Sequence, residues 1–245
     1  MSDAMTRAAI VTGGTGGVGA ATVALLRSKG YGVVSVDLAP APAAWAGDDG
    51  IVALTGDVSQ ETTAEAAVRT AEERFGRLDV LVNNAGLFLR KGIAETSIAD
   101  VERLLRVNVI GTFAFTRAAI PALARTGGAI VNLGSISGLV GSPQQGAYSI
   151  TKGAIVQFTR QSAIELAEQG IRVNAVAPGA IDTDFVGKAV ASGSLPGNSN
   201  DAIRQNNPLG RISSAEEIAD AIVWLAESPA VTGAILSIDG GHTAR

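Results

Sequence analysis

The chain has 245 residues, of which 47% are hydrophobic and 17% charged, and its formal net charge is −4. This composition is typical of one folded α/β domain with a large core, and it excludes a disordered chain. The slightly acidic balance argues against a nucleic-acid partner, and the absence of cysteine excludes disulfides, thiolate nucleophiles and cysteine-ligated metals.

The start of the chain carries no recognisable targeting signal. The segment of residues 1–7 is short and polar. It leads directly into the strand-like run Ala8–Val11, without an apolar signal-peptide core. No run of 18 apolar residues occurs, so we expect no transmembrane helix and no membrane partner. From these missing signals we predict a cytoplasmic protein.

Short β-branched segments alternate with longer segments of helical periodicity. The predicted strands are 8–12, 32–37, 51–55, 78–82, 129–134, 171–176 and 234–238, and the predicted helices are 17–29, 60–75, 98–124, 147–169 and 215–226. This alternation predicts an α/β fold with a parallel sheet covered by helices on both faces. Residues 179–210 form the longest irregular stretch. We therefore predict a single domain over residues 1–245 with a lid segment near 180–210.

A glycine-rich loop follows the first predicted strand. Residues 12–19 read Thr-Gly-Gly-Thr-Gly-Gly-Val-Gly and lead into an alanine-rich helix. Glycines here allow a tight turn and bring backbone N–H groups to a pyrophosphate at the helix N-terminus. Such a loop alone is often only a turn, but the strand–loop–helix context favours a dinucleotide site. We expect cofactor contacts from Gly13, Thr15, Gly17, Val18 and Gly19.

The second predicted strand ends in Asp37, followed by Leu38. A carboxylate at this position accepts hydrogen bonds from the adenosine ribose and repels a 2′-phosphate. Neither Gly16 nor residues 38–39 supply a Lys or Arg to balance such a phosphate. NAD is therefore favoured over NADP, and the alternative is a surface Asp that merely ends a strand.

Polar residues also follow the third and fourth predicted strands. Ligands of open α/β sheets bind outside the carboxyl ends of the strands, where these residues lie. Asp57 is placed to bond the adenine amino group, whereas Asn83 is expected to pin neighbouring strands. The further contacts expected here are Val58, Asn84, Ala85 and Gly86.

Tyr148 and Lys152 are four residues apart in a predicted helix, with Ser135 thirteen residues before the tyrosine. Positions i and i+4 lie on one helix face, so an ammonium stands next to a phenol. A neighbouring cation favours the phenolate, and we therefore expect a lowered tyrosine pKa. The pattern indicates a proton-transfer device for hydride chemistry. We prefer Ser135 over Ser137 as the donor to an oxygen that gains charge.

Together these motifs resemble the short-chain dehydrogenase/reductase family in its compact single-domain form. The resemblance runs from residue 8 to residue 241, and it adds Asn108, Pro178-Gly179 and Ile238–Gly241 to the motifs above. It implies a three-layer Rossmann-type fold with a central seven-stranded parallel sheet. It also implies a homotetramer or homodimer.

The resemblance further implies a role for each site residue. Tyr148 is the acid/base on the substrate oxygen, Ser135 orients that oxygen, and Lys152 holds the nicotinamide ribose. Asn108 holds a kinked helix and a water that links Lys152 to solvent. The residues implied to contact the nicotinamide are Pro178, Gly179, Ile181 and Thr183.

We therefore predict an NAD-dependent oxidoreductase that interconverts a small-molecule secondary alcohol and a ketone. The alternatives are an NADPH-type ketoacyl or carbonyl reductase, a nucleotide-sugar epimerase or dehydratase, and a non-catalytic NAD-binding regulatory protein. No metal site is predicted, because the single histidine, His242, has no ligand partner in the sequence. We expect Asp182 and Asp184 to cap a lid helix rather than act as a catalytic pair. The substrate pocket is expected from segments 87–93, 139–146 and 180–207.

Overall fold

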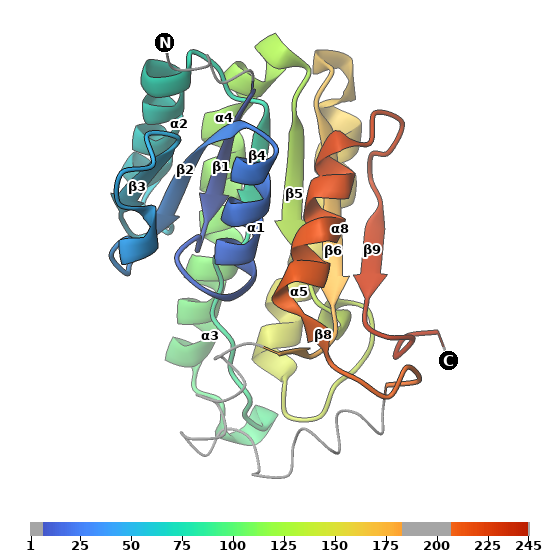
Figure 1. Cartoon of the computed structure of the whole chain (residues 1–245). Helices are drawn as coiled ribbons and strands as arrows, with labels where there is room; N and C mark the ends of the chain where they lie inside the picture. Colours follow the sequence, from blue (N-terminus) through green and yellow to red (C-terminus); the bar gives the residue numbers. More distant parts are fainter. Residues whose placement is uncertain (1–6, 183–206, 245) are drawn as a thin grey trace.

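The computed structural model describes residues 7–182 and 207–244. Its centre is the expected seven-stranded, fully parallel sheet, and its strands lie in the order β3-β2-β1-β4-β5-β6-β9 (Figure 1). A separate pair of two-residue strands joins β7 (Ile181–Asp182) to β8 (Ser213–Ser214). The sheet strands are β1 (Arg7–Thr12), β2 (Tyr31–Asp37), β3 (Ile51–Thr55), β4 (Val80–Asn83), β5 (Ala129–Leu133), β6 (Arg172–Pro178) and β9 (Ile235–Ile238).

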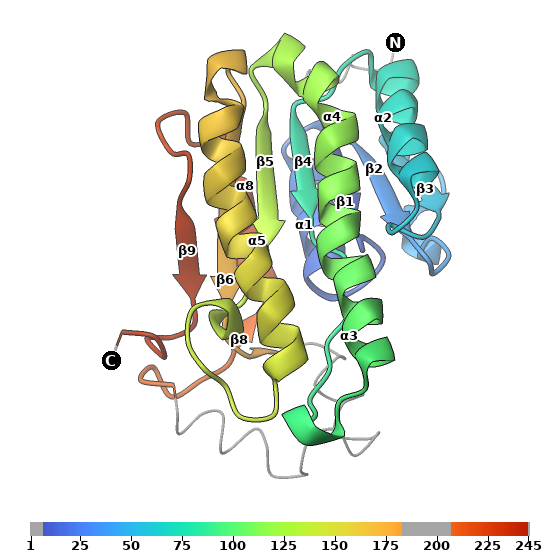
Figure 2. The ribbon, with the colours of Figure 1, turned by 180° about the vertical axis from the view of Figure 1, so that it is seen from behind.

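Helices cover both faces of this sheet and complete three layers. One face carries α1 (Gly17–Ser28) and α8 (Ala215–Glu227) (Figure 1). The opposite face carries α2 (Glu61–Phe75), α4 (Thr112–Thr126) and α5 (Gly146–Glu165) (Figure 2). The strands are buried between two separate apolar cores, which explains why their sequences are continuously hydrophobic rather than alternating.

The strand order reverses between β1 and β4. These two strands are neighbours in the sheet, although β2 and β3 lie between them in the chain. A crevice opens at the carboxyl ends of the strands where connections leave toward opposite faces. The glycine-rich loop after β1 and residues 84–86 after β4 therefore meet at one place.

A single helical run extends from Ile98 to Thr126. It consists of α3 (Ile98–Leu105), the π-helical segment η3 (Arg106–Gly111) and α4. Its 29 residues, with a mean hydropathy of 1.4 in the most apolar window, are long and apolar enough to cross a membrane. From the sequence we expect no helix that could span a membrane, and among the described residues this run is the one that meets the length and hydropathy criteria. Half of that window is buried inside the fold, as in the core helix of a globular domain.

Only the two ends of the predicted lid segment, near 180–210, belong to the described residues. Residues 183–206, and with them Thr183, Asp184 and the predicted lid helix, lie outside the described residues. Asp182 ends the short strand β7 and is exposed. On the far side of the segment, Ser214 caps α8, and its side chain accepts a hydrogen bond from the backbone N–H of Glu217.

Candidate active site

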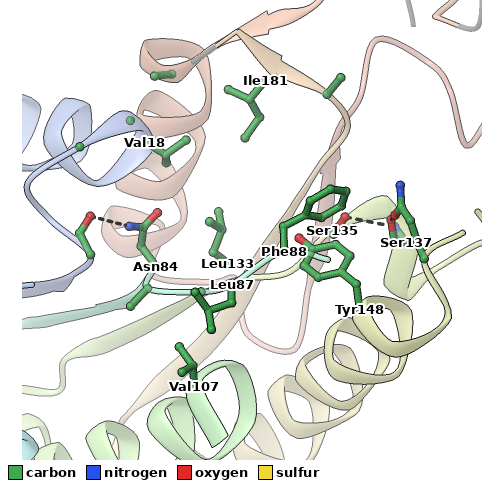
Figure 3. Close-up of a pocket in the computed structure, with 18 of the residues that line it drawn as sticks. Val18, Asn84, Leu87, Phe88, Val107, Leu133, Ser135, Ser137, Tyr148 and Ile181 are labelled. Atoms are coloured by element: carbon green, nitrogen blue, oxygen red, sulfur yellow. Dashed lines mark hydrogen bonds between the residues drawn. The ribbon is translucent and has the colours of Figure 1, made fainter. Parts of the chain in front are cut away.

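One cavity of ≈ 1270 Å³ lies at the carboxyl end of the sheet. Its wall includes the glycine-rich loop and Asp37 toward one end and Ser135 and Tyr148 toward the other. Figure 3 shows how side chains from widely separated segments converge around this space. Such a volume exceeds what one small ligand fills, since typical ligand pockets hold about 300–1,000 Å³.

The glycine-rich loop is packed closely against β4 and its own helix. Gly13 adopts φ +64, and a Cβ there would lie 2.9 Å from the Cα atom of Ala85. A Cβ on Gly19 would collide with the carbonyl oxygen of Gly13, so the start of α1 can approach the loop only with glycine here. Around Gly16, in contrast, the space is open. At its glycines the loop thus presents backbone to the cavity, which suits a pyrophosphate.

Asp37 is held in a defined orientation at the end of β2. Its Oδ2 atom accepts a hydrogen bond from the backbone N–H of Thr15 at 3.1 Å, and Oδ1 accepts one from Ala39 at 3.1 Å. Burial acts to raise the pKa of this carboxyl, but hydrogen bonds from Thr15, Ala39 and Leu38 outweigh it and lower the pKa. A negative charge therefore stands beside the glycine loop, with Leu38 exposed next to it.

The residues after β3 line the same end of the cavity. Asp57 accepts a hydrogen bond from the backbone N–H of Ser59 at 2.9 Å, and this bond is the main cause of its lowered pKa. Val58 is buried, and both residues contribute to the cavity wall. The carboxylate is thereby ionised and fixed at the point where the sequence placed an adenine contact.

The two asparagines after β4 have different surroundings. Asn83 is buried, and its amide donates to Asn132 at 2.9 Å and to Thr116 at 3.2 Å, so it ties β4 to β5 and α4 as expected. Asn84 lines the cavity (Figure 3). Its amide donates to the carbonyl oxygens of Thr12 and Gly13. Asn84 therefore also braces the glycine loop.

Ser135 and Tyr148 lie together at the other end of the cavity. Ser135 caps a 3₁₀ turn after β5, and its Oγ accepts a hydrogen bond from the backbone N–H of Ser137 at 3.2 Å. The Ser137 hydroxyl instead donates to Gln145 at 2.5 Å, so it is engaged elsewhere. The ring of Phe88 packs edge-on against the Tyr148 ring at 4.9 Å (Figure 3). An apolar wall thus adjoins the phenol.

Lys152 is almost completely buried, with 4% of its surface exposed. Its ammonium donates to the backbone carbonyl of Leu133 at 2.6 Å and lies 5.7 Å from the centroid of the Tyr148 ring. The i, i+4 spacing therefore brings the cation and the phenol together as expected. Burial lowers the pKa of Lys152 to about 8.

The expectation of a lowered pKa for Tyr148 is wrong for the chain without a bound cofactor. Burial raises the pKa of Tyr148 to about 12, and the hydrogen bond with Ser135 lowers it only in part. The physical reason is desolvation, which penalises the charged phenolate more than the neighbouring groups stabilise it. At neutral pH the described chain therefore holds Tyr148 as a neutral phenol.

Asn108 sits in the π-helical segment and is buried. Its Oδ1 accepts from the backbone N–H of Leu87 at 2.7 Å, and its amide donates to the carbonyl of Leu87 at 2.9 Å and to Thr151 at 3.0 Å. The Thr151 hydroxyl donates in turn to the carbonyl of Tyr148 at 2.8 Å. Asn108 thus joins the segment after β4 to the helix that carries Tyr148.

Most predicted cofactor residues line the cavity, and a few support it from behind. Gly19, Asn108, Lys152 and Pro178 are not part of its wall, although each lies beside residues that are. Arg90 lines it from the segment 87–93 that the sequence predicted for the substrate pocket, whereas the sequence prediction missed Arg103, Leu133 and His242, which also line it. His242, the single histidine, is half-buried at the cavity wall. Among the described residues no cluster of potential metal ligands occurs.

The chain is similar to several known proteins over almost its whole length. A family model described as enoyl-(acyl carrier protein) reductase matches residues 13–243. An uncharacterized short-chain type dehydrogenase/reductase of Sinorhizobium fredii is 38% identical over 241 residues, which cover 96% of this chain but only 43% of that protein.

Two further relatives and one solved structure match end to end. A cis-4-hydroxycyclohexanecarboxylate dehydrogenase of Sinomonas cyclohexanicum is 39% identical, covering 97% of each chain. A 3-oxoacyl-[acyl-carrier-protein] reductase of Rattus norvegicus is 37% identical, covering 97% of this chain and 98% of that one. The structure of ElxO with NADP bound has a TM-score of 0.89 and 32% identity, covering 98% of this chain and 100% of that chain.

Proposed function

The chain belongs to the short-chain dehydrogenase/reductase family, and from that premise we propose that it is an NAD-dependent oxidoreductase that interconverts a secondary alcohol and a ketone. The observation that carries the proposal is the single cavity shared by the glycine loop, Asp37, Ser135 and Tyr148. A dinucleotide site and a proton-transfer site are thereby open to each other.

The glycine loop fits a dinucleotide because Gly13, Gly16 and Gly17 bring its backbone to the cavity wall. Gly13, Gly17 and Val18 would hold the pyrophosphate, and Asp37 would accept hydrogen bonds from the adenosine ribose. Tyr148 would hold the nicotinamide ribose, with Gly179 and Ile181 along the ring. Lys152, which lies behind the wall beside Tyr148, would bond the same ribose. When bound, the nicotinamide supplies the hydride donor or acceptor.

The chain's own residues move the proton. Tyr148 is a neutral phenol at neutral pH, so it can donate its proton to a ketone oxygen as that oxygen gains charge. Ser135 stands beside it and stabilises the same oxygen by a hydrogen bond. In the direction of alcohol oxidation Tyr148 must first lose its proton, for which Lys152 supplies a fixed positive charge.

NAD rather than NADP is proposed because Asp37 is an ionised carboxylate fixed beside the loop. A second negative group, such as a 2′-phosphate, would be repelled there. The NADP-bound ElxO structure and the rat 3-oxoacyl reductase favour an NADPH-type reductase as the second candidate. The two candidates differ in the ratio of activities with NAD and NADP. They differ also in the use of a 3-oxoacyl thioester.

The test is turnover by the purified chain over a panel of secondary alcohols and ketones, each with both dinucleotides. The panel includes hydroxy acids and their neutral amides, since the Sinomonas relative is named for a hydroxycyclohexanecarboxylate. We expect NAD to be preferred with at least one alcohol. A preference for NADPH together with a 3-oxoacyl thioester would establish the second candidate instead. No turnover of any pair would reject both.

Tyr148→Phe removes the proton-transfer group and leaves the cavity shape nearly unchanged. We expect turnover to fall at least about 100-fold, the usual contribution of general acid–base catalysis, while NAD still binds. Tyr31→Phe is the matched control, because Tyr31 is buried at the far end of β2 and should leave turnover unchanged. Turnover of Tyr148→Phe near the wild-type rate would reject the role of Tyr148.

A further inference from the structure

Arg90 contributes a positive charge to the part of the cavity next to Tyr148. Two of the segments that contribute to the cavity wall are residues 87–90 after β4, where Phe88 packs on the Tyr148 ring, and residues 141–145 before α5. Of the residues that these segments contribute to the wall, Arg90 is the one with a charged side chain. The others, Leu87, Phe88, Gly141, Ser142, Pro143 and Gln145, are apolar or neutral.

The guanidinium of Arg90 is held in place by Gln144. Arg90 Nε donates to Gln144 Oε1 at 3.2 Å, while the backbone N–H of Lys91 donates to the carbonyl of Gln144 at 2.6 Å. Gln144 has φ 59, which is the left-handed conformation that a residue other than glycine adopts only at a cost. A parallel bridge between Lys91 and Gln145 completes the connection of the two segments. The position of Arg90 is therefore built into the wall.

Arg90 still has donors to offer. An arginine carries five N–H donors in a planar fork, and Gln144 uses the one on Nε. Within residues 7–182 and 207–244 no acceptor bonds the two terminal nitrogens of Arg90, and no carboxylate pairs with it. Two terminal N–H groups side by side match the two oxygens of a carboxylate.

The acidic residues closest in sequence are already engaged. Asp100 pairs with the Lys91 ammonium at 3.2 Å and accepts from the backbone N–H of Ser97. Glu95 accepts from the backbone N–H of Gly92 at 3.1 Å. Local acids therefore do not neutralise Arg90, and its charge is directed to what enters the cavity.

We propose that Arg90 binds a carboxylate on the substrate, so that the substrate class is a hydroxy acid or keto acid. An apolar body would lie along Leu87 and Phe88, between the carboxylate at Arg90 and the reacting carbon at Tyr148. This inference rests on the proposed oxidoreductase function. It narrows that function to substrates with an anionic end.

The experiment compares acids with neutral partners of the same shape. Levulinate is paired with levulinamide, and cyclohexanone carboxylate with its primary amide, in wild type and in Arg90→Gln. We expect wild type to prefer the acid, and Arg90→Gln to lower kcat/KM for the acid about 10- to 100-fold, the usual effect of losing hydrogen bonds to a charged group. The amide should change less than about threefold. Arg90→Lys keeps the charge but not the fork and should recover only part of the loss.

Arg69→Gln is the control for net charge, because Arg69 is exposed on α2 outside the cavity. It should leave the acid-to-amide ratio unchanged. An equal loss for acid and amide in Arg90→Gln, or no preference for any acid in wild type, would overturn the inference while leaving the oxidoreductase function intact.

A binding measurement separates failure of the inference from failure of the proposed function. Cyclohexanecarboxylate and cyclohexanecarboxamide are titrated calorimetrically into the wild-type and Arg90→Gln chains in the presence of NAD. Selective binding of the carboxylate that depends on Arg90, without turnover of any ketone, would support the anion site and reject the oxidoreductase. Equal binding of both compounds would reject the anion site.

Discussion

At the scale of single residues, burial controls the protonation of the proton-transfer pair. The same desolvation raises the pKa of Tyr148 to about 12 and lowers that of Lys152 to about 8, because it disfavours whichever form is charged. The carbonyl of Leu133 holds the ammonium close to the ring and partly compensates for its burial. Additional positive charge in the cavity is then required before the phenol ionises near neutral pH.

The chain has only two tyrosines, so this ionisation can be observed directly. In a Tyr31→Phe chain the ultraviolet phenolate absorbance reports Tyr148 alone. Without dinucleotide we expect no phenolate signal at or below pH 10.0, the ordinary tyrosine pKa, because burial raises the pKa of Tyr148 to about 12. Saturating NAD brings a nicotinamide cation into the cavity, and this should lower the pKa of Tyr148 below 10.0.

Lys152→Met in the same background supplies the control. Removing the ammonium should weaken the shift that NAD produces, although NAD binding itself is measured separately by calorimetry. A Tyr148 titration that stays near 12 with NAD bound would show that the charges do not activate this phenol.

At the scale of elements, the π-helical segment and the N-terminal cap of α8 fix the positions of residues at the cavity wall. The π-helical turn Arg106–Gly111 puts Asn108 against the backbone of Leu87, and Asn108 thereby supports the wall that carries Phe88. At the other side of the cavity, Ala215 and Glu216 at the start of α8 line the wall. The N-terminus of α8 therefore needs a fixed position.

The capping box at Ser214 and Glu217 is a testable part of this design. The Ser214 side chain accepts from the N–H of Glu217, and the Glu217 carboxylate accepts from the N–H of Ser214 at 2.9 Å. Ser214→Ala should lower the free energy of unfolding by about 1 kcal/mol, measured by urea denaturation. Ser228→Ala, at the exposed C-terminal end of the same helix, should change it by less than about 0.5 kcal/mol. Equal effects of the two substitutions would contradict a capping role.

The contribution of Glu217 should depend on pH. Hydrogen bonds from Arg211, and then from the Ser214 backbone, lower the pKa of Glu217 from 4.5 to about 2. A lowered folded-state pKa stabilises the fold above the unfolded value and loses this effect as the pH falls through the folded value. The difference in stability between wild type and Glu217→Gln should therefore be complete above about pH 4.5 and shrink toward pH 2. This difference in stability should be small, because solvent screens the exposed ion pair between Arg211 and Glu217.

At the scale of the whole molecule, α4 and α5 both expose large apolar side chains. Phe113 is 52% exposed and packs against Phe158 of α5, and Ile164 is 74% exposed on the same helix. Both helices lie on the face shown in Figure 2. Large apolar side chains exposed on neighbouring helices are typical of surfaces that associate with another protein.

We expect the chain to assemble into a homotetramer or homodimer through this surface. Gel filtration with light scattering should then give a mass that is a multiple of the single-chain value of 24.7 kDa. Phe113→Glu combined with Ile164→Glu should lower the mass toward that value, because a charge buried in an interface is unfavourable. Leu38→Glu, at an exposed apolar residue at the end of β2, is the control and should leave the mass unchanged. A wild-type mass of 24.7 kDa would contradict the assembly.

The sequence alone determined the order of strands and helices, the position of the dinucleotide loop, and the pairing of Tyr148 with Lys152. These features depend on periodicity and spacing over short stretches, which local physical chemistry governs. Only the tertiary structure decided that Tyr148 is a weaker acid than usual and that Asn108 lies in a π-helical turn. It also decided that Arg90 faces the cavity with unused donors. Desolvation and hydrogen-bond partners are set by residues far apart in the chain, and no local pattern encodes which of them will meet.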